Sequence, residues 1–152
     1  MRLSSRLIPE LVLVDPAVRD RDALFRLFGE VLHEHGLVAD PTVVESRLTE
    51  REHILSTGIG GGVAVPHAQI PGLGRLVMAA SVHPGGLDYP ALDDEPVRLV
   101  FCLLGDTNTT ADHLAGLARL ARLARSRQSL AELVAVRSGQ QFVDVLVRLE
   151  EG

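Results

Sequence analysis

The chain has 152 residues, of which 46% are hydrophobic and 23% charged, and its net charge is −5. These values are typical of one globular domain, residues 1–152, and exclude a disordered chain. The longest apolar runs are far shorter than the roughly 18 residues of a membrane span. The single cysteine excludes a disulfide scaffold.

Charge and composition also bear on partners and location. All 15 basic residues are arginine, the isoelectric point is about 5.6 and aromatic residues make up 3% of the chain. This composition argues against a nucleic-acid partner. No apolar stretch suited to a secretory signal precedes Asp15, so we expect a cytoplasmic protein.

The N-terminal part predicts one strand followed by one helix. The apolar run at residues 11–14 ends at Asp15 and Pro16, as expected of a short buried strand. Asp15 or Pro16 then begins a helix, in which apolar residues from Ala23 onwards recur at helical spacing, and Gly36 ends it.

A second helix and a glycine-rich segment follow. Asp40 is the expected N-cap and Pro41 the first helical residue, and the helix runs to about His53. Glycines are concentrated within residues 58–67, which predicts an irregular loop. Within this loop, residues 63–65 are expected to be extended because a proline follows them.

Two further strands are predicted at residues 76–82 and 97–104, where apolar runs are bounded by proline, glycine and aspartate. Thr109 or Thr110 then caps a helix with a leucine- and alanine-rich stripe.

Ser129 and Ser138 precede the last two helical stretches, so the complete order is β-α-α-β-β-β-α-α-α. Helices from both ends of the chain can cover the two faces of one central sheet, and short connections between strands favour some antiparallel pairs. We therefore expect an α+β fold with three layers, α/β/α, around a central mixed β-sheet.

The glycine-rich loop is the first candidate site. Glycine allows backbone amides to approach a ligand closely, and His67 ends the loop directly after Pro66, which stiffens the backbone. A tight turn with an incidental histidine explains the same residues equally well. A dinucleotide-binding loop does not, because the segment follows a helix and no helix follows the glycines.

Two more residues are candidates for chemistry. His113 lies in the first turn of a predicted helix, where the helix dipole disfavours a protonated ring, although a polar residue facing water is the simpler interpretation. Arg51 lies near the end of the second helix, and a guanidinium can hold a phosphoryl group. A helix-terminal cation or a partner of Glu45 or Glu52 accounts for this arginine as well.

No cofactor or metal is expected. The six histidines and one cysteine lack the spacing of a zinc site, and His33 and His35 fall on different faces of a helix. Cys102 lies within an apolar strand and is expected to be a buried, unreactive thiol.

Together, these residues resemble a known family. The stretch REHILSTGIGGGVAVPHA, residues 51–68, is similar to the signature of the type-2 IIA domains of the bacterial phosphoenolpyruvate-dependent sugar phosphotransferase system. These domains include fructose/mannitol-type and nitrogen-regulatory IIA proteins. Residues 86–101 resemble the family's stretch leading into a core strand, and residues 113–121 resemble the helix of its second histidine. The resemblance covers nearly the whole chain.

The resemblance implies a role for each matching residue. His67 matches the histidine that carries the phosphoryl group covalently, His113 the second active-site histidine, and Arg51 the arginine beside the phosphoryl group. Thr57 matches a motif position whose hydroxyl would reach the site and bind the phosphoryl group. Such domains accept the phosphoryl group from the phosphocarrier protein HPr or a relative, and transport members pass it to a cysteine of a IIB component.

Phosphoryl transfer of this kind needs positioned groups and charge stabilisation, and a neutral imidazole is a competent nucleophile at pH 7. The phosphorylated intermediate must avoid hydrolysis, so we expect a shallow site that a partner covers. Its apolar rim is expected at Ile59, Val63, Ile70 and Leu73.

The chain departs from the family in two respects. Members often have a proline just after the core strand, where this chain has Leu104-Gly105-Asp106, so the loop before His113 is expected to differ. No IIB or IIC segment is present in the sequence, so we expect the acceptor to be a separate protein.

The main hypothesis is a carrier in sugar uptake that takes a phosphoryl group from phospho-HPr on His67 and passes it to a IIB component. The alternative is a nitrogen-regulatory-type protein whose binding partners depend on the phosphorylation state of His67. A third possibility is a IIA fold without phosphoryl chemistry, and the joint presence of Arg51, His67 and His113 argues against it.

Overall fold

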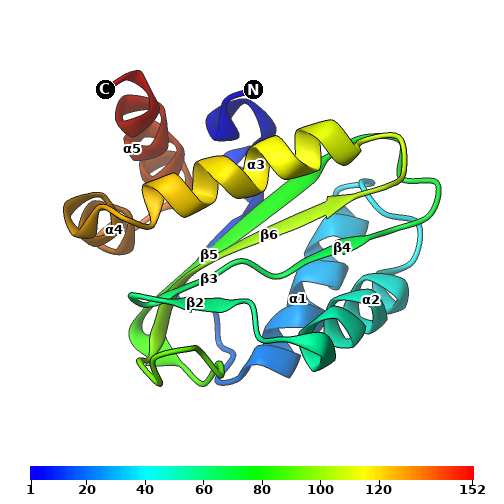
Figure 1. Cartoon of the computed structure of the whole chain (residues 1–152), viewed down its shortest axis with the longest axis horizontal. Helices are drawn as coiled ribbons and strands as arrows, with labels where there is room; N and C mark the ends of the chain where they lie inside the picture. Colours follow the sequence, from blue (N-terminus) through cyan, green and yellow to red (C-terminus); the bar gives the residue numbers. More distant parts are fainter.

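The computed structural model describes residues 1–152 and has one central sheet between two layers of helices (Figure 1). The elements in chain order are the short 3-10 helices η1 (Leu3–Arg6) and η2 (Pro9–Leu11), β1 (Val12–Val14), α1 (Arg21–Glu34), α2 (Pro41–Ile54), β2 (Gly58–Gly60), β3 (Val63–Ala64), β4 (His67–Gln69), β5 (Val77–Leu87), β6 (Val97–Gly105), α3 (Thr110–Leu123), α4 (Arg127–Val134) and α5 (Gly139–Glu151).

The sheet has six strands in the order β1-β5-β6-β3-β2, and β4 pairs with β6 beyond the end of β3. The long strands β5 and β6 are antiparallel, whereas β1 runs parallel to β5, and β3 and β4 run parallel to β6. The sheet is therefore mixed, and the predicted three-layer fold is confirmed.

Helices cover both faces of the sheet. In Figure 1, α1 and α2 lie side by side on one face, and α3 crosses the other face with α4 and α5 beyond its C-terminal end. None of the helices combines the length and the apolarity that a membrane crossing requires.

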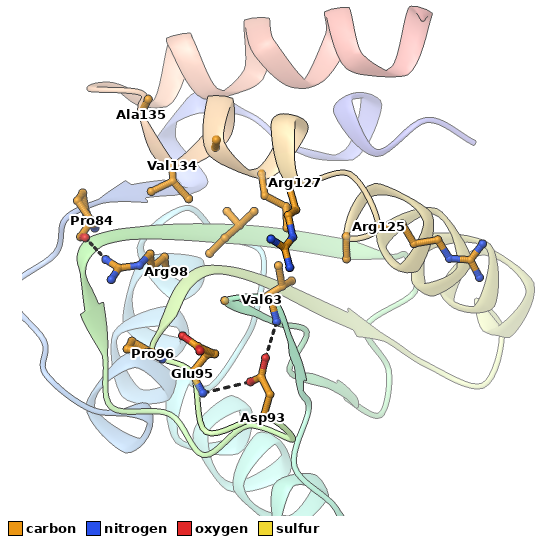
Figure 2. Close-up of a pocket in the computed structure, with 16 residues that line it drawn as sticks. Val63, Pro84, Asp93, Glu95, Pro96, Arg98, Arg125, Arg127, Val134 and Ala135 are labelled. Carbon is orange, nitrogen blue, oxygen red and sulfur yellow. Dashed lines mark hydrogen bonds between the residues drawn. The ribbon is translucent and has the colours of Figure 1, made fainter.

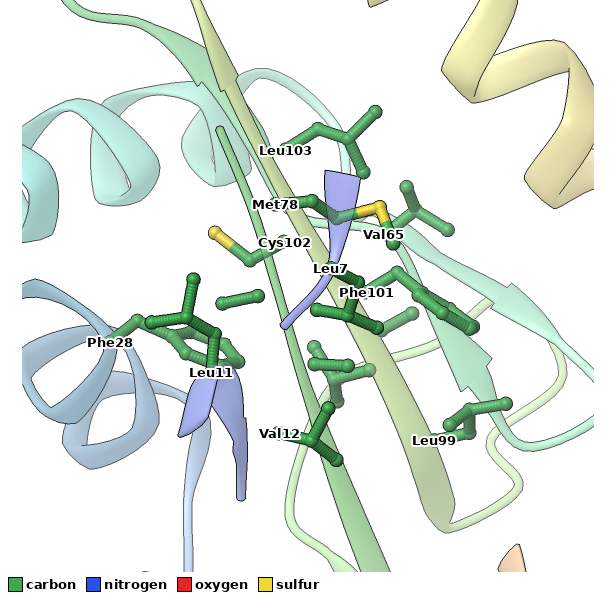
Figure 3. Close-up of a cluster of buried hydrophobic side chains, with 14 of the residues drawn as sticks. Leu7, Leu11, Val12, Phe28, Val65, Met78, Leu99, Phe101, Cys102 and Leu103 are labelled. Atoms are coloured by element: carbon green, nitrogen blue, oxygen red, sulfur yellow. The ribbon is translucent and has the colours of Figure 1, made fainter. Parts of the chain in front are cut away.

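Strand β6 is buried on both faces, which explains its uninterrupted apolar sequence. Its residues Leu99 to Leu104 are all at most 1% exposed. Figure 3 shows Cys102 on the same side of the strands as Phe28 of α1, and Leu99 and Phe101 on the other side. Burial raises the pKa of the Cys102 thiol to about 12, in line with the expected unreactive core thiol.

Two helices begin where the capping residues predict. Asp40 caps α2 by accepting the N–H of Thr42 at 2.9 Å, and Ser138 caps α5 by accepting the N–H of Gln141 at 3.1 Å. Thr109 is the N-cap of α3, although its side chain makes no capping bond to the helix.

Two predicted helix starts are wrong. Helix α1 begins at Arg21, not at Asp15 or Pro16, because Asp20 is the residue whose carboxylate accepts an N–H of the first turn, at 2.9 Å. Helix α4 begins earlier than predicted, because Ser126 is the N-cap and accepts the N–H of Ser129 at 3.2 Å.

The glycine-rich segment is more regular than predicted. It forms β2, β3 and β4, and the last two pair with β6. Strand β5 likewise continues through a bulge at Pro84–Gly86 to Leu87, where the sequence predicted its end at residue 82. In both places the strand that pairs with the segment is distant in sequence, so local residue types do not predict the pairing.

Candidate functional site

His67 is held at the start of β4, where it lies opposite Leu103 of β6. Its ring Nδ1 is 2.7 Å from the carbonyl oxygen of Val65. A carbonyl oxygen only accepts hydrogen bonds, so in the neutral ring Nδ1 carries the proton. Nε2 is then the ring nitrogen with the free lone pair.

His113 projects from the first turn of α3 toward His67. The two ring centroids are 5.5 Å apart, and the ring planes meet at 68°. The backbone N–H of His113 donates to the carbonyl of Thr109 at 2.9 Å, which fixes the histidine in the helix. The glycine-rich segment and α3 thus bring their histidines into van der Waals range.

Gly105, the last residue of β6, allows His113 to lie so close to the sheet. A side chain at this position would put its Cβ 2.6 Å from Oγ1 of Thr109 and 3.1 Å from Nδ1 of His113. The first distance is shorter than the contacts that real Cβ atoms make, so Thr109 leaves no room for a side chain at position 105. The reason for the glycine is this close approach and not its backbone conformation.

The loop after Gly105 is held by the carboxylate of Asp106. Asp106 is 5% exposed, and its side chain accepts the N–H of Asn108 at 2.8 Å and that of Gly74 at 2.5 Å. These bonds tie the β6–α3 loop to the β4–β5 loop. The start of α3, and with it His113, is therefore anchored by Asp106.

Arg51 lies in the last turn of α2, and its Nη1 donates to the carbonyl oxygen of Leu55 at 3.0 Å. It serves as a helix-terminal cation, as the simpler interpretation predicts. The carboxylates of Glu45 and Glu52 pair with other arginines, at 3.5 and 3.9 Å, and not with Arg51. The guanidinium therefore has no carboxylate partner.

The side chains of Arg51, His67 and His113 line one shallow hollow of about 340 Å³. Its complete lining is Arg47, Glu50, Arg51, Ile54, His67, Ala68, Gln69 and His113. Sequence analysis missed Arg47, Glu50 and Ile54. Arg47 lies four residues before Arg51 and Ile54 three residues after it, so both share its face of α2. Glu50 is next to Arg51 in sequence but is three residues from Arg47 and four from Ile54, so helical periodicity links it to the same surface.

Both histidines of the hollow favour the neutral form. Burial lowers the pKa of His67, and the nearby Arg51 lowers it further, while the hydrogen bond to Val65 opposes the shift. Burial also lowers the pKa of His113, and the neighbouring His67 adds to this effect. At pH 7 the hollow therefore contains two neutral imidazoles and the cationic Arg51.

The structure does not bring Thr57 to the hollow. Thr57 is 3% exposed, and its hydroxyl contacts the Glu52 carboxylate and lies 2.5 Å from the Tyr89 hydroxyl. Tyr89 in turn donates to Glu52 at 2.6 Å. Thr57 thus belongs to a buried polar cluster with Glu52 and Tyr89. It binds the carboxylate of Glu52, the residue that follows Arg51 in sequence.

The apolar rim also differs from the prediction. Val63 and Ile70 are 2% and 8% exposed and belong to the core. Ile59 and Leu73 line two other depressions rather than the hollow. The apolar residues in the lining are Ala68, which is 8% exposed, and Ile54, which is 80% exposed.

Comparisons with known proteins agree with the fold. Residues 6–148 match the family described as "Phosphoenolpyruvate-dependent sugar phosphotransferase system, EIIA 2". The chain is similar to the nitrogen regulatory protein of Bradyrhizobium diazoefficiens, with 33% identity over 149 residues, 96% of this chain and 95% of the relative. It is also similar to the PTS system fructose-specific EIIA component of Haloferax volcanii, with 28% identity over 142 residues, 93% of this chain and 92% of the relative.

Among solved structures, the nitrogen regulatory protein IIA-Ntr from Neisseria meningitidis superposes with a TM-score of 0.87 at 29% identity, covering 95% of this chain and 98% of that one. The matched region spans nearly the whole chain, including the segment from Arg51 to His67 and the helix of His113. The chain belongs to the type-2 IIA family of the phosphoenolpyruvate-dependent sugar phosphotransferase system.

Proposed function

We propose that the protein is a cytoplasmic phosphoryl carrier that accepts a phosphoryl group from an HPr-type phosphocarrier on His67. It passes the group to a separate IIB component in sugar uptake. One observation carries the proposal: His67, His113 and Arg51 line a single hollow, and the hydrogen bond to Val65 leaves Nε2 of His67 free. Residues 1–152 act as one IIA domain.

The transfer exchanges one phosphorus–nitrogen bond for another. Nε2 of His67 attacks the donor phosphorus in line, and the bond from phosphorus to the donor imidazole breaks. The donor ring, protonated at its other nitrogen, leaves as a neutral imidazole with the bonding electron pair. The His67 ring becomes a phosphorylated imidazolium, and its Nδ1–H remains bonded to Val65. The carbonyl therefore stabilises positive charge that develops on the ring.

Arg51 and His113 would stabilise the transferring group. The phosphoryl group carries its charge on three equatorial oxygens, which need hydrogen-bond donors. Arg51 has N–H groups beyond the one bound to Leu55, and the neutral His113 ring has one N–H. Thr57 has no direct contact in this proposal, because its hydroxyl is already bound to Glu52 and Tyr89.

A partner would close the open hollow. Ile54, Leu55 and Leu114 are 80%, 61% and 61% exposed, and each belongs to or flanks an element of the hollow. Large exposed apolar side chains around a site mark a protein–protein contact. The docked carrier would exclude water while the phosphoryl group is in transit. The proposal requires no metal or cofactor, since the donor is a phosphohistidine.

Incubation with phosphoenolpyruvate, enzyme I and HPr tests the proposal. The wild type is expected to gain one acid-labile phosphate, detected by mass spectrometry and ³¹P NMR, and His67→Gln is expected to gain none. His35→Gln is a matched control, because His35 also has Nδ1 bonded to a carbonyl, at 2.9 Å from Val31, but lies outside the hollow.

This control is expected to be phosphorylated like the wild type. A wild type that stays unphosphorylated, or a His67→Gln protein that gains as much phosphate as the wild type, would refute the proposal. A ³¹P and ¹⁵N correlation that places the phosphorus on Nδ1 would refute the assignment of Nε2.

The second candidate function is regulatory. Two relatives named nitrogen regulatory proteins support it, one by 33% sequence identity and the other by a TM-score of 0.87. In this alternative the roughly two negative charges added at His67 change which proteins bind the surface around the hollow. The chemistry at His67 is the same, and only the use of the phosphoryl group differs.

The two functions are separable with the purified phosphoprotein. Mixed with the IIB components of the same organism, a transport protein loses its phosphate to a IIB cysteine within seconds to minutes. A regulatory protein retains the phosphate, and its phosphorylated and unphosphorylated forms capture different partners in a pull-down. Identical captures by both forms would exclude the regulatory function.

A further inference from the structure

A second cavity, larger than the hollow, lies elsewhere on the molecule. It is a groove of about 900 Å³ between the β2–β3 turn and β6 on one side and α4 on the other (Figure 2). The groove shares no lining residue with the hollow of His67. A cavity of this volume lies within the range of small-ligand sites, which is about 300–1,000 Å³.

The floor of the groove is apolar. Val63 of β3, Leu99 of β6 and Leu130 of α4 line it and are 2%, 1% and 8% exposed. Ala131 and Val134 extend the same surface along α4. A ligand with a hydrocarbon body would gain free energy by covering these side chains.

Charged side chains also line the groove, and the arginines among them form no ion pair with an acidic residue. Figure 2 shows Arg127, the first residue of α4, reaching into the groove toward Val63, whereas Arg125 points away. Neither Arg127 nor Arg98 has a carboxylate within 4.0 Å, and the guanidinium of Arg98 donates to the backbone carbonyl of Pro84. An arginine beside apolar surface favours an anionic group with two oxygens.

The acidic residues of the groove lie on the opposite wall. Asp93 is already engaged, because its carboxylate accepts the N–H of Gly61 at 2.9 Å and that of Glu95 at 3.1 Å. Glu95 forms no ion pair. The α4 side of the groove is therefore positive and the loop side negative, which favours one anionic group over a polyanion.

We propose that this groove binds a small molecule consisting of a single carboxylate attached to an apolar body. The carboxylate accepts two N–H bonds from Arg127, and the body covers Val63, Leu99 and Leu130. This binding is independent of the phosphoryl chemistry proposed for His67, because no residue serves both sites.

Two probes with the same phenyl ring and four-carbon chain test the proposal: 4-phenylbutyrate, which ends in a carboxylate, and 4-phenylbutanol, which ends in a neutral hydroxyl. Titration into ¹⁵N-labelled full-length protein is expected to shift the amide signals of Gly62, Leu99 and Leu130. The carboxylate is expected to bind at least tenfold more tightly than the alcohol. Replacement of Arg127 by glutamine is expected to abolish that preference.

Arg125→Gln is the matched control, because it removes a second exposed arginine two residues away, which lines the edge of the groove but whose guanidinium points away from Arg127 and Val63 (Figure 2). It is expected to bind both probes like the wild type. Ala131→Trp, which fills the groove from the exposed side of α4, is expected to bind neither. Thermal unfolding of each variant checks that the fold is retained.

Equal affinity of the wild type for the two probes would overturn the proposal, as would shifts confined to residues outside the groove or the absence of saturable shifts. Equal weakening by Arg125→Gln and Arg127→Gln would also overturn it, because that result indicates general charge attraction rather than a site on Arg127.

Discussion

At the residue scale, one hydrogen bond decides how His67 can act. The carbonyl of Val65 holds Nδ1 at 2.7 Å, so the ring has both a fixed orientation and a fixed tautomer. In the proposed transfer, the same bond would stabilise the imidazolium formed by phosphorylation of Nε2. Under the proposed function, the backbone two residues before His67 would thus both orient the nucleophile and stabilise its charge.

The lowered pKa of His67 predicts a pH dependence. A protonated ring has no lone pair, so phosphoryl acceptance falls as the pH drops through the pKa of His67. Burial lowers this pKa, so acceptance is expected to persist below pH 6.5, the ordinary histidine value, and to be flat from pH 7 to 8. Single-turnover rates measure the pH dependence of phosphoryl acceptance, and NMR titration of the His67 ring measures its pKa. A midpoint above about 6.5 would contradict the prediction.

Arg51 and His113 are expected to contribute to the rate rather than to the fold. Loss of one transition-state donor slows an enzyme by roughly 10²–10³-fold. Arg51→Ala and His113→Ala are each expected to slow phosphoryl acceptance by about this factor, measured in single turnovers. Arg51→Lys keeps the charge but not the planar donors, and it is expected to recover only part of the rate.

Arg47→Ala provides the comparison for Arg51, because Arg47 lines the same hollow one helical turn earlier. It is expected to reduce the rate less than Arg51→Ala. Wild-type rates in both Arg51→Ala and His113→Ala would remove these residues from the proposed mechanism.

Thr57 is expected to matter for stability and not for transfer. Thr57→Val removes a hydroxyl that contacts the buried Glu52 carboxylate, so the free energy of unfolding is expected to fall by about 1–3 kcal/mol. Phosphoryl acceptance by the folded variant is expected to stay within about twofold of the wild type. Denaturant unfolding and single-turnover assays separate the two effects, and a large loss of rate in a stable variant would return Thr57 to the site.

At the scale of elements, the end of β6 sets the position of α3. Gly105 lies against Thr109 and His113, and a Cβ there would clash with Thr109 Oγ1 at 2.6 Å. Asp106 ties the following loop to Gly74. The strand end and the helix start therefore behave as one unit that presents His113 to His67.

Gly105→Ala is expected to push α3 outward. Overpacking of this kind costs about 1–3 kcal/mol of stability, and the displaced His113 should slow phosphoryl acceptance. Gly85→Ala is the matched control, because a Cβ at Gly85 meets no atom within 4 Å. A Gly105→Ala variant with wild-type rate and an unshifted His113 NMR signal would contradict the proposed contact.

At the scale of the whole molecule, a buried histidine links stability to pH. His83 of β5 is 3% exposed, its Nε2 lies 2.8 Å from Oγ of Ser81, and burial lowers its pKa to about 4. In the unfolded chain this pKa is near 6.5. The unfolded state therefore binds the proton first, and His83 causes no loss of stability above about pH 6.5.

As the pH falls from 6.5 toward 4, protonation of the unfolded state is expected to destabilise the protein by about 3 kcal/mol through His83 alone. His83→Gln retains a hydrogen-bonding side chain next to Ser81 and removes the titration. The measurement is the difference in unfolding free energy between wild type and variant across this range. A constant difference from pH 7 to 4 would contradict the prediction.

Much of the fold is readable from local sequence, because its signals are local. Asp40 and Ser138 cap helices as predicted, since a capping bond spans only two or three residues. The apolar run of β6 identified a fully buried strand. The match to the IIA signature pointed to Arg51, His67 and His113 without any knowledge of distances.

The sequence by itself determined the order of the main elements, the family and the three candidate site residues, because these depend on residue types and on spacing along the chain. Only the tertiary structure decided that the glycine-rich segment pairs with β6, that Thr57 faces inward, that Val63 and Ile70 are buried, and that Gly105 supports His113. Each of these facts depends on a contact between segments distant in the chain, and local residue preferences do not specify which distant segment will be the partner.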